Sequence, residues 1–283
     1  MMVRVKIARS AKTFDDLFRL RYRVYVEQGG YIPARPEQRL CDRFDAIPGT
    51  TLMVAEVEGE LVGTVRFTRD LGAGTHANDF YDFAAHLPPD ARVGSGSMLA
   101  VDEDWQGTPR LTSSLVGMCI YHAAAAGLTH LLGTVNPEAL DGFMRFGFRA
   151  VDGILTQPSS QLPFCPVILD LGRLEGRVAA FVQRQIEHSF LLSQDRLFLA
   201  PGAQLVARVD ESYYVLGGLL EQYGMGGSKL EFGPGDYVHH NPMDGPILAT
   251  SKVDLLALPR HATTADIVAS PYPDARPGQL PAM

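Results

Sequence analysis

The chain has 283 residues, of which 46% are hydrophobic and 20% charged, so it can bury a core and is long enough for two domains. Its net charge of -7 argues against nucleic acid as a partner, because such binding needs a basic surface that neutralises phosphates. Three scattered cysteines predict neither disulfides nor a structural zinc site. No segment approaches the length of a membrane span, so we expect a cytoplasmic protein without membrane insertion.

The first elements alternate between strand and helix. Residues 3–8 (VRVKIA) predict a short strand, and Ser10 or Thr13 caps a helix with apolar side chains at helical spacing. Arg21 lies on that apolar stripe, one turn after Leu17 and one turn before Tyr25, where a charge is unexpected. It therefore either has a partner inside the protein or packs its stem while its head reaches water.

Residues 51–68 (TLMVAEVEGELVGTVRFT) predict two strands around a turn at Glu58-Gly59-Glu60. Further along, the patterns predict a strand, a helix ended by Gly127, a strand, a short helix capped by Asn136, and a last strand. Their ranges are residues 97–102, 110–127, 130–135, 137–147 and 166–171. This order predicts an α/β fold, a mixed sheet flanked by helices, over residues 1–172.

After Gly172 the composition changes. Residues 173–196 predict a connecting amphipathic helix, and residues 197–260 are short apolar runs broken by Gly and Pro, which is typical of a small all-β domain. Residues 261–283 form a Pro-rich tail that we expect to be disordered.

The segment FLAPGAQLVARVDESYYVLGGLLE, followed by FGPGDYV, resembles the jelly-roll-like β-roll of cyclic-nucleotide-binding domains. A working site of that kind needs a Gly-Glu pair and an arginine for the cyclic phosphate, and neither follows Asp236. The neighbours His239 and His240 point to opposite faces of a strand, so we expect no metal site there. A packing module or an interface with a partner is the favoured interpretation.

The order of elements and the segment FMRFGFRAV resemble the GCN5-related N-acyltransferase (GNAT) superfamily. Within it, LRYRVYVEQGGY, CDRFDAIPGTTLMVAEVEGELVGTVRFT and SGSMLAVD are similar to the branch of autoinducer (acyl-homoserine-lactone) synthases and long-chain N-acyl amino acid synthases. Asp42-x-x-Asp45 and Gly63-x-x-Arg66 carry the resemblance. Leu40 and Ser95-Gly96-Ser97-Met98 replace a Glu and an acidic-x-Ser-Arg stretch of the autoinducer synthases, which argues against S-adenosylmethionine as acceptor and against lactone signalling.

Acyl transfer from a thioester to an amine needs a free amine, a donor for the developing oxyanion and a proton acceptor. Asp42 and Asp45 are candidates to attract the ammonium group and take its proton; the alternative is that they form turns or ion pairs. The resemblance places Arg21, this loop and Arg66 around one acceptor pocket, with Tyr25 and Tyr31 as further candidate contacts. An unpaired arginine in the apolar strand of Arg66 would be costly, so we expect it to have a partner.

The resemblance also implies a bulged strand whose main-chain N–H groups, near Leu99 to Val101, face the thioester carbonyl. The loop WQGTPRLT stands where the superfamily has a Gly-rich turn around the pyrophosphate of coenzyme A, but Pro109 removes one N–H donor. Gly107, Thr108, Arg110 and Thr112 are candidate phosphate contacts; Arg110 and Thr112 are equally interpreted as solvated residues at a helix start. This weakened loop favours acyl carrier protein, whose pantetheine arm carries one phosphate, as the donor.

Phe143 and Phe146 are interpreted as acyl-chain lining or as core, and His122 as a packed core histidine. The leading hypothesis is an N-acyltransferase that moves a medium or long acyl chain from acyl carrier protein or coenzyme A to the amine of an amino acid or similar small molecule. No tightly bound cofactor is expected, and a homo-oligomer is compatible with the sequence. The alternatives are an acetyl-coenzyme A transferase and a non-catalytic ligand sensor with a decayed transferase half.

Overall fold

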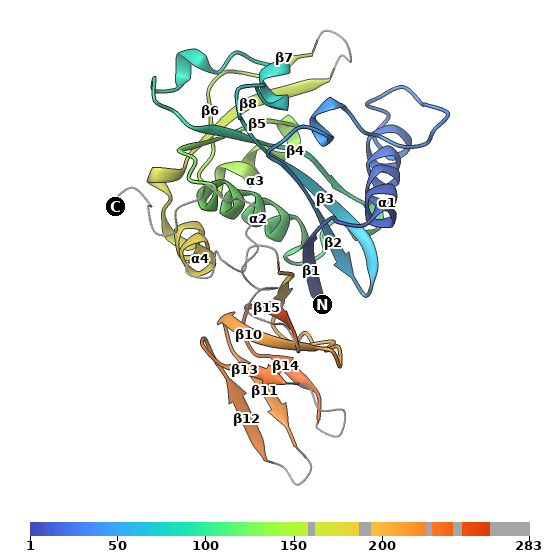
Figure 1. The fold of residues 1–283 in the computed structure, drawn as a ribbon, viewed down its shortest axis with the longest axis vertical. Helices are drawn as coiled ribbons and strands as arrows, with labels where there is room; N and C mark the ends of the chain where they lie inside the picture. The colour runs from blue at the N-terminus through green and yellow to red at the C-terminus, as the bar shows by residue number, and fades with distance from the viewer. Residues whose placement is uncertain (158–161, 187–193, 225–227, 240–244, 261–283) are drawn as a thin grey trace.

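The computed structural model describes residues 1–157, 162–186, 194–224, 228–239 and 245–260. A mixed sheet forms its centre (Figure 1), and the neighbouring strands lie in the order β1, β2, β3, β4, β5, β8, β6. These strands are β1 (Met2–Ile7), β2 (Thr50–Val57), β3 (Glu60–Arg69), β4 (Val93–Val101), β5 (His130–Val135), β6 (Arg149–Ala150) and β8 (Pro163–Asp170), with β7 (Leu155–Thr156) also paired to β8. The predicted mixed α/β fold is confirmed.

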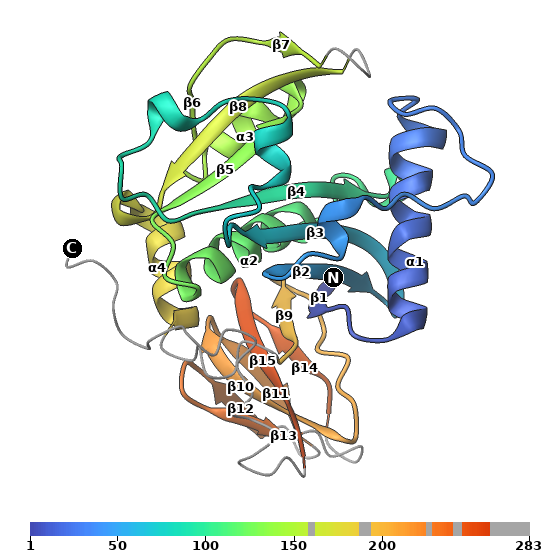
Figure 2. The same cartoon turned by 45° about the horizontal axis from the view of Figure 1, so that its top comes forward.

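The hairpin of β2 and β3 turns at Glu58 and Gly59, whose φ angles of 54° and 89° suit a two-residue turn of type I′. Strands β4 and β5 run parallel and pair only over Val93–Ser95 and His130–Leu132 within the described residues. Beyond these pairs β5 and β8 diverge from β4 (Figure 2). The sheet is therefore split along the second half of β4.

Four α-helices accompany the described strands: α1 (Ala11–Tyr22), α2 (Leu111–Ala125), α3 (Leu140–Met144) and α4 (Gly176–Ile186). Ser10 caps α1, since its hydroxyl accepts the N–H of Thr13 at 3.0 Å. The predicted first helix does not continue as an α-helix to Tyr25, because a π-helix, η1 (Arg23–Gln28), follows α1. Short helical turns fill the connections: η2 (Arg43–Asp45), η3 (His76–Asp79), η4 (Ala84–His86), η5 (Glu103–Trp105), η6 (Pro137–Ala139) and η7 (Leu171–Arg173).

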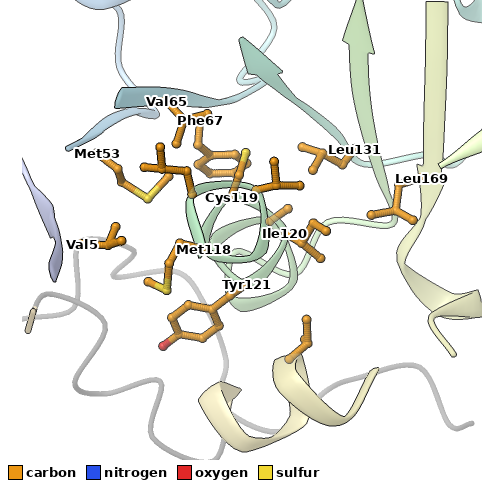
Figure 3. Packing of buried hydrophobic residues seen from close by; sticks show 14 of the residues in the cluster. Val5, Met53, Val65, Phe67, Met118, Cys119, Ile120, Tyr121, Leu131 and Leu169 are labelled. Carbon is orange, nitrogen blue, oxygen red and sulfur yellow. The ribbon is translucent and has the colours of Figure 1, made fainter. Parts of the chain in front are cut away.

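The two faces of the sheet are covered by different helices. Met53 and Ala55 of β2 belong to the large core around α2. Figure 3 shows this helix end-on, with its own side chains Met118, Cys119 and Tyr121 projecting into the core. Leu52 and Val54, which alternate with them, pack on the other face against Leu17 of α1. His122 lies fully buried in α2, as its interpretation as a core residue required.

The C-terminal part is all-β, as predicted: β9 (Arg196–Leu199), β10 (Glu211–Gly217), β11 (Leu220–Tyr223), β12 (Lys229–Phe232), β13 (Tyr237–His239), β14 (Ile247–Ala249) and β15 (Val253–Pro259). Strands β12, β11 and β14 form one sheet, and β13, β10, β15 and β9 continue the central sheet because β9 pairs with β1. Ion pairs of Arg4 with Asp195 and Glu211 reinforce this junction. The expected tail, residues 261–283, lies outside the described residues, as do residues 187–193 of the expected connecting helix.

Candidate active site

A buried cluster of charges lies on the α1 face of the sheet, around Arg66 of β3. The side chain of Arg66 is fully buried, and its Nε donates to Ser97 Oγ at 2.9 Å. Its Nη1 donates to Asp42 Oδ1 at 2.5 Å and to Asp45 Oδ1 at 3.0 Å, while Nη2 donates to Asp42 Oδ2 at 3.0 Å. Arg66 therefore has the partners that its apolar strand required.

Arg21 reaches the same cluster from α1. Its Nη1 donates to Asp45 Oδ1 at 2.8 Å, and the two side chains are 0% and 5% exposed. Its guanidinium also lies 5.7 Å from the ring centre of Phe18. Of the two explanations for an arginine on the apolar stripe, the buried partner is the one that the structure contains. Asp45 thus links Arg21 to Arg66.

The loop that carries the two carboxylates is held by its own hydrogen bonds. Asp42 Oδ1 accepts the N–H of Phe44 at 2.8 Å, and Asp45 Oδ2 accepts the N–H of Asp42 at 2.9 Å, which is a capping box around η2. Burial alone would raise the pKa of Asp42, but the hydrogen bonds and charge of Arg66 outweigh it, so this pKa lies below its ordinary value. Every oxygen of both carboxylates accepts a hydrogen bond, so the geometry favours charge balance with the two arginines.

Strand β4 carries a bulge beside this cluster. Thr64 pairs with Ala100 and Arg66 with Ser97, so Met98 and Leu99 together lie opposite the single residue Val65. Met98 has a φ of 51°, in the left-handed region that non-glycine residues rarely adopt. A bulge leaves the extra residue without a ladder partner, which suits a main-chain oxyanion donor. Val101 lies beyond the bulge, in register with Gly63.

Some of the predicted site residues lie together at the charge cluster, and others lie away from it. Arg21, Tyr25, Asp42, Asp45, Arg66 and Leu99 come together, since the Tyr25 hydroxyl donates to Leu99 O at 2.9 Å. Tyr31 is 37% exposed, and its backbone N–H bonds to the carbonyl of Tyr25. Phe143 and Phe146 instead pack against the core on the α2 side. Their role as acyl-chain lining stays a prediction.

The loop before α2 uses several of its own hydrogen-bonding groups. Thr108 N donates to Trp105 O and Leu111 N to Thr108 O, each at 3.2 Å, and Pro109 has no N–H. Gly107 and Thr112 are exposed. Arg110 turns toward the C-terminal strands: Nη1 donates to Leu199 O at 2.9 Å and to Val253 O at 2.6 Å, and the guanidinium pairs with Asp254. A role of Arg110 in phosphate binding would compete with these bonds.

Two residues near the cluster were missed in the sequence. Ser97, the partner of Arg66, could have been found from strand alternation, because it faces Arg66 across β3 and β4. His76 of η3 carried no local signal. Its Nε2 lies 3.8 Å from Asp42 Oδ2, and its ring packs against Phe44 and Phe80 with centroid separations of 5.6 and 4.9 Å.

His76 predicts a pH dependence of stability. Burial lowers its pKa to about 4, and the charge of Arg66 adds to this effect. Because an unfolded histidine titrates near 6.5, the unfolded state binds more protons between pH 6.5 and 4, so the free energy of unfolding falls as pH drops through that window. We expect His76→Gln to remove on the order of 2 kcal/mol of this fall, measured by urea unfolding at pH 7 and 4.5. Equal pH slopes for both proteins would contradict it.

In the described parts of the chain, no helix combines the length and apolar character that crossing a bilayer requires. Likewise, the described residues contain no group of three or more His, Cys, Asp or Glu side chains that could hold a metal ion.

Several solved structures are similar to this chain. The solved structure of FeeM, an N-acyl amino acid synthase from uncultured soil microbes, is similar with a TM-score of 0.50 and 18% identity, over 60% of this chain and 91% of that chain. MesI, a CoA-dependent acyl-homoserine lactone synthase, reaches 0.49 and 17% over 64% and 94%, and Escherichia coli ElaA 0.46 and 14% over 60% and 100%.

No curated protein sequence matches the chain. The family model described as "N-acyl amino acid synthase FeeM" matches residues 16–170, which include the charge cluster and the bulged strand. Because that match spans more than half of the chain, this N-acyltransferase belongs to the family of FeeM-type N-acyl amino acid synthases.

Proposed function

We propose that the chain transfers a medium or long acyl group from a thioester to the α-amine of an amino acid whose carboxylate binds Arg21. One observation carries this proposal: among the described residues, Nε and Nη2 of the fully buried Arg21 have no hydrogen-bond partner. Leaving a buried donor unpaired costs about 1–3 kcal/mol, and more for a charged group. The two oxygens of a carboxylate are the natural partners for two adjacent guanidinium donors.

The rest of the cluster supports the same reaction. The amine nitrogen attacks the thioester carbon, the carbonyl oxygen takes up negative charge near the β4 bulge, and the C–S bond breaks as the thiolate leaves. The amine proton passes through water to Asp42, the more accessible carboxylate, which is 28% exposed against 5% for Asp45. The thiolate regains a proton from solvent.

Acyl carrier protein is the proposed donor, with coenzyme A as the alternative. In the loop before α2, the N–H groups of Thr108 and Leu111 donate to carbonyls of the loop itself. Arg110 is bonded to the C-terminal strands. Few donors therefore remain for a pyrophosphate. The single phosphate of a pantetheine arm needs fewer hydrogen-bond donors than a pyrophosphate does. Tight binding of coenzyme A would favour a small-molecule acetyltransferase instead.

The proposal is tested by comparing an amino acid with the amine left by its decarboxylation. Mass spectrometry of extracts from cells that express the chain first identifies the acylated amino acid. The purified wild type should then prefer the amino acid over its decarboxylated amine. Arg21→Gln should reduce that preference by about 10- to 100-fold, the worth of a hydrogen bond to a charged group.

Arg19→Gln is the matched control, because Arg19 lies on the same helix with a side chain that is 50% exposed and pairs with Asp15. It should keep the wild-type preference. The ratio of the two rates does not depend on how much enzyme is folded, so loss of stability in Arg21→Gln cannot imitate the result. An unchanged preference in Arg21→Gln, or no acylated amine from wild type, would contradict the proposal.

A further inference from the structure

Side chains of the π-helix η1 bond to Leu99 of strand β4 and to Asp102, the residue that follows the strand. The wide turn of η1 is closed by the bond from Gly29 N to Val24 O, five residues back, at 2.9 Å. From this turn the Tyr25 hydroxyl donates to Leu99 O at 2.9 Å. Directly after the end of the strand, Asp102 accepts bonds from Arg23, at 2.5 Å, and from Gln28 Nε2, at 3.1 Å.

The hydrogen bond from Tyr25 is made to a residue of the β4 bulge. Met98 and Leu99 are the two residues that oppose Val65, and Met98 holds a φ of 51°. A backbone of this kind persists only where its surroundings over-determine it, and such strain gathers at functional sites. The hydroxyl of Tyr25 supplies a constraint that the strand ladder lacks, because it fixes the direction in which the Leu99 carbonyl points.

The protonation state of the Tyr25 phenol suits a hydrogen-bond donor. Burial raises the pKa of Tyr25 to about 12, so the hydroxyl keeps its proton and stays a hydrogen-bond donor at neutral pH. A peptide whose carbonyl accepts a hydrogen bond also presents a more polarised N–H, because linked hydrogen bonds strengthen one another. The Leu99 carbonyl shares its peptide with the N–H of Ala100, so the bond from Tyr25 acts on the geometry of the bulge and on the donor strength of this neighbouring N–H.

We propose that Tyr25 is a positioning residue for the oxyanion: through Leu99 it orients the main-chain donors of the β4 bulge. This assignment rests on the proposed acyl transfer, in which the carbonyl oxygen gains charge as the C–N bond forms and loses it as the C–S bond breaks. The phenol touches no reacting atom and exchanges no proton. Its effect reaches the substrate through the backbone of β4, from the wide turn of η1.

Tyr25→Phe, which removes only the hydroxyl, tests this. Tyr22→Phe is the matched control, because Tyr22 is a buried tyrosine of the preceding helix turn and its hydroxyl accepts the N–H of Arg35 at 3.3 Å, away from β4. Rates are measured with decanoyl-pantetheine and with its 2,2-difluoro analogue, whose carbonyl needs less help to carry charge, on the acceptor found in cell extracts. Tyr25→Phe should lower kcat about tenfold or more with decanoyl-pantetheine at nearly unchanged KM, and clearly less with the analogue.

Tyr22→Phe should stay within about twofold for both donors. Equal losses with the two donors would show that Tyr25 has a merely structural role, and an unaffected Tyr25→Phe would overturn the proposal as well. In both cases an active wild type keeps the proposed function. A wild type that acylates no amine would overturn the proposed function together with this inference. Because the donor comparison is a ratio within one protein, reduced folding of a variant does not affect it.

Discussion

Replacing Asp45 by asparagine is expected to lower the free energy of unfolding by roughly 3–5 kcal/mol, because removing one partner of a buried pair leaves its charges uncompensated. Asp45 Oδ1 accepts bonds from Arg21 and Arg66, which are both fully buried. Its Oδ2 closes the capping box that shapes η2, so the loop that carries Asp42 should also loosen. Urea unfolding measures the first effect, and the acyl-transfer rate, which should fall below detection, measures the second.

Asp79→Asn provides the comparison for this variant. Asp79 pairs with Arg43 at 2.6 Å, but the two side chains are 44% and 68% exposed. An exposed pair is worth between 0 and about 1 kcal/mol, so the control should remain close to wild type in stability and rate. If Asp45→Asn were as mild as Asp79→Asn, the charge cluster would not be the structural centre of the site.

The second large effect is expected at Asp254, where the C-terminal strands join the transferase half. Asp254 is 6% exposed and pairs with Arg110, from the loop before α2, and with Arg184 of α4. Asp254→Asn leaves the cation of Arg110, whose side chain is 15% exposed, without its carboxylate. We expect a loss of roughly 3 kcal/mol, at the lower end for a buried pair because Arg184 remains partly exposed.

Glu231→Gln is the control for this variant. It tests whether the loss of stability depends on where the carboxylate lies or only on the removal of a negative charge. Glu231 of β12 pairs with Lys229 in an ion pair whose side chains are 66% and 41% exposed. Its loss should cost less than about 1 kcal/mol. Thermal unfolding followed by circular dichroism compares the two variants, and similar melting temperatures would refute the view that Asp254 anchors the C-terminal strands.

The fold was predictable wherever short stretches of the chain decide the structure. The hairpin of β2 and β3 follows from two alternating strands around Glu58-Gly59, and β5 occupies the predicted residues 130–135. The charge cluster was foreseeable only in part: an arginine in an apolar strand needs a buried partner, but it was the family resemblance that placed Asp42 and Asp45 beside Arg66.

What escaped prediction depends on residues far apart in the chain. Arg4 and Arg110 look like ordinary surface charges in their own segments, yet their partners Glu211 and Asp254 come much later in the sequence. The π-helix that places Tyr25 against Leu99 has the same apolar spacing as an α-helix, so the hydrophobic pattern does not distinguish them. His76 approaches Asp42 from η3, a turn that packs against β4 and β5 and lies far from Asp42 in the sequence.

The pairing of β9 with β1 has a consequence for synthesis on the ribosome. Met2 to Val5 of β1 form their outer ladder with Arg196 to Leu199, which are translated long after β1 and β2 have emerged. At about 5–20 residues per second, the outer edge of β1 stays open for roughly 10–40 s in each nascent chain. An open strand edge invites pairing with other chains. Folding yield should therefore depend on the speed of elongation and on chaperones that shield this edge until β9 arrives.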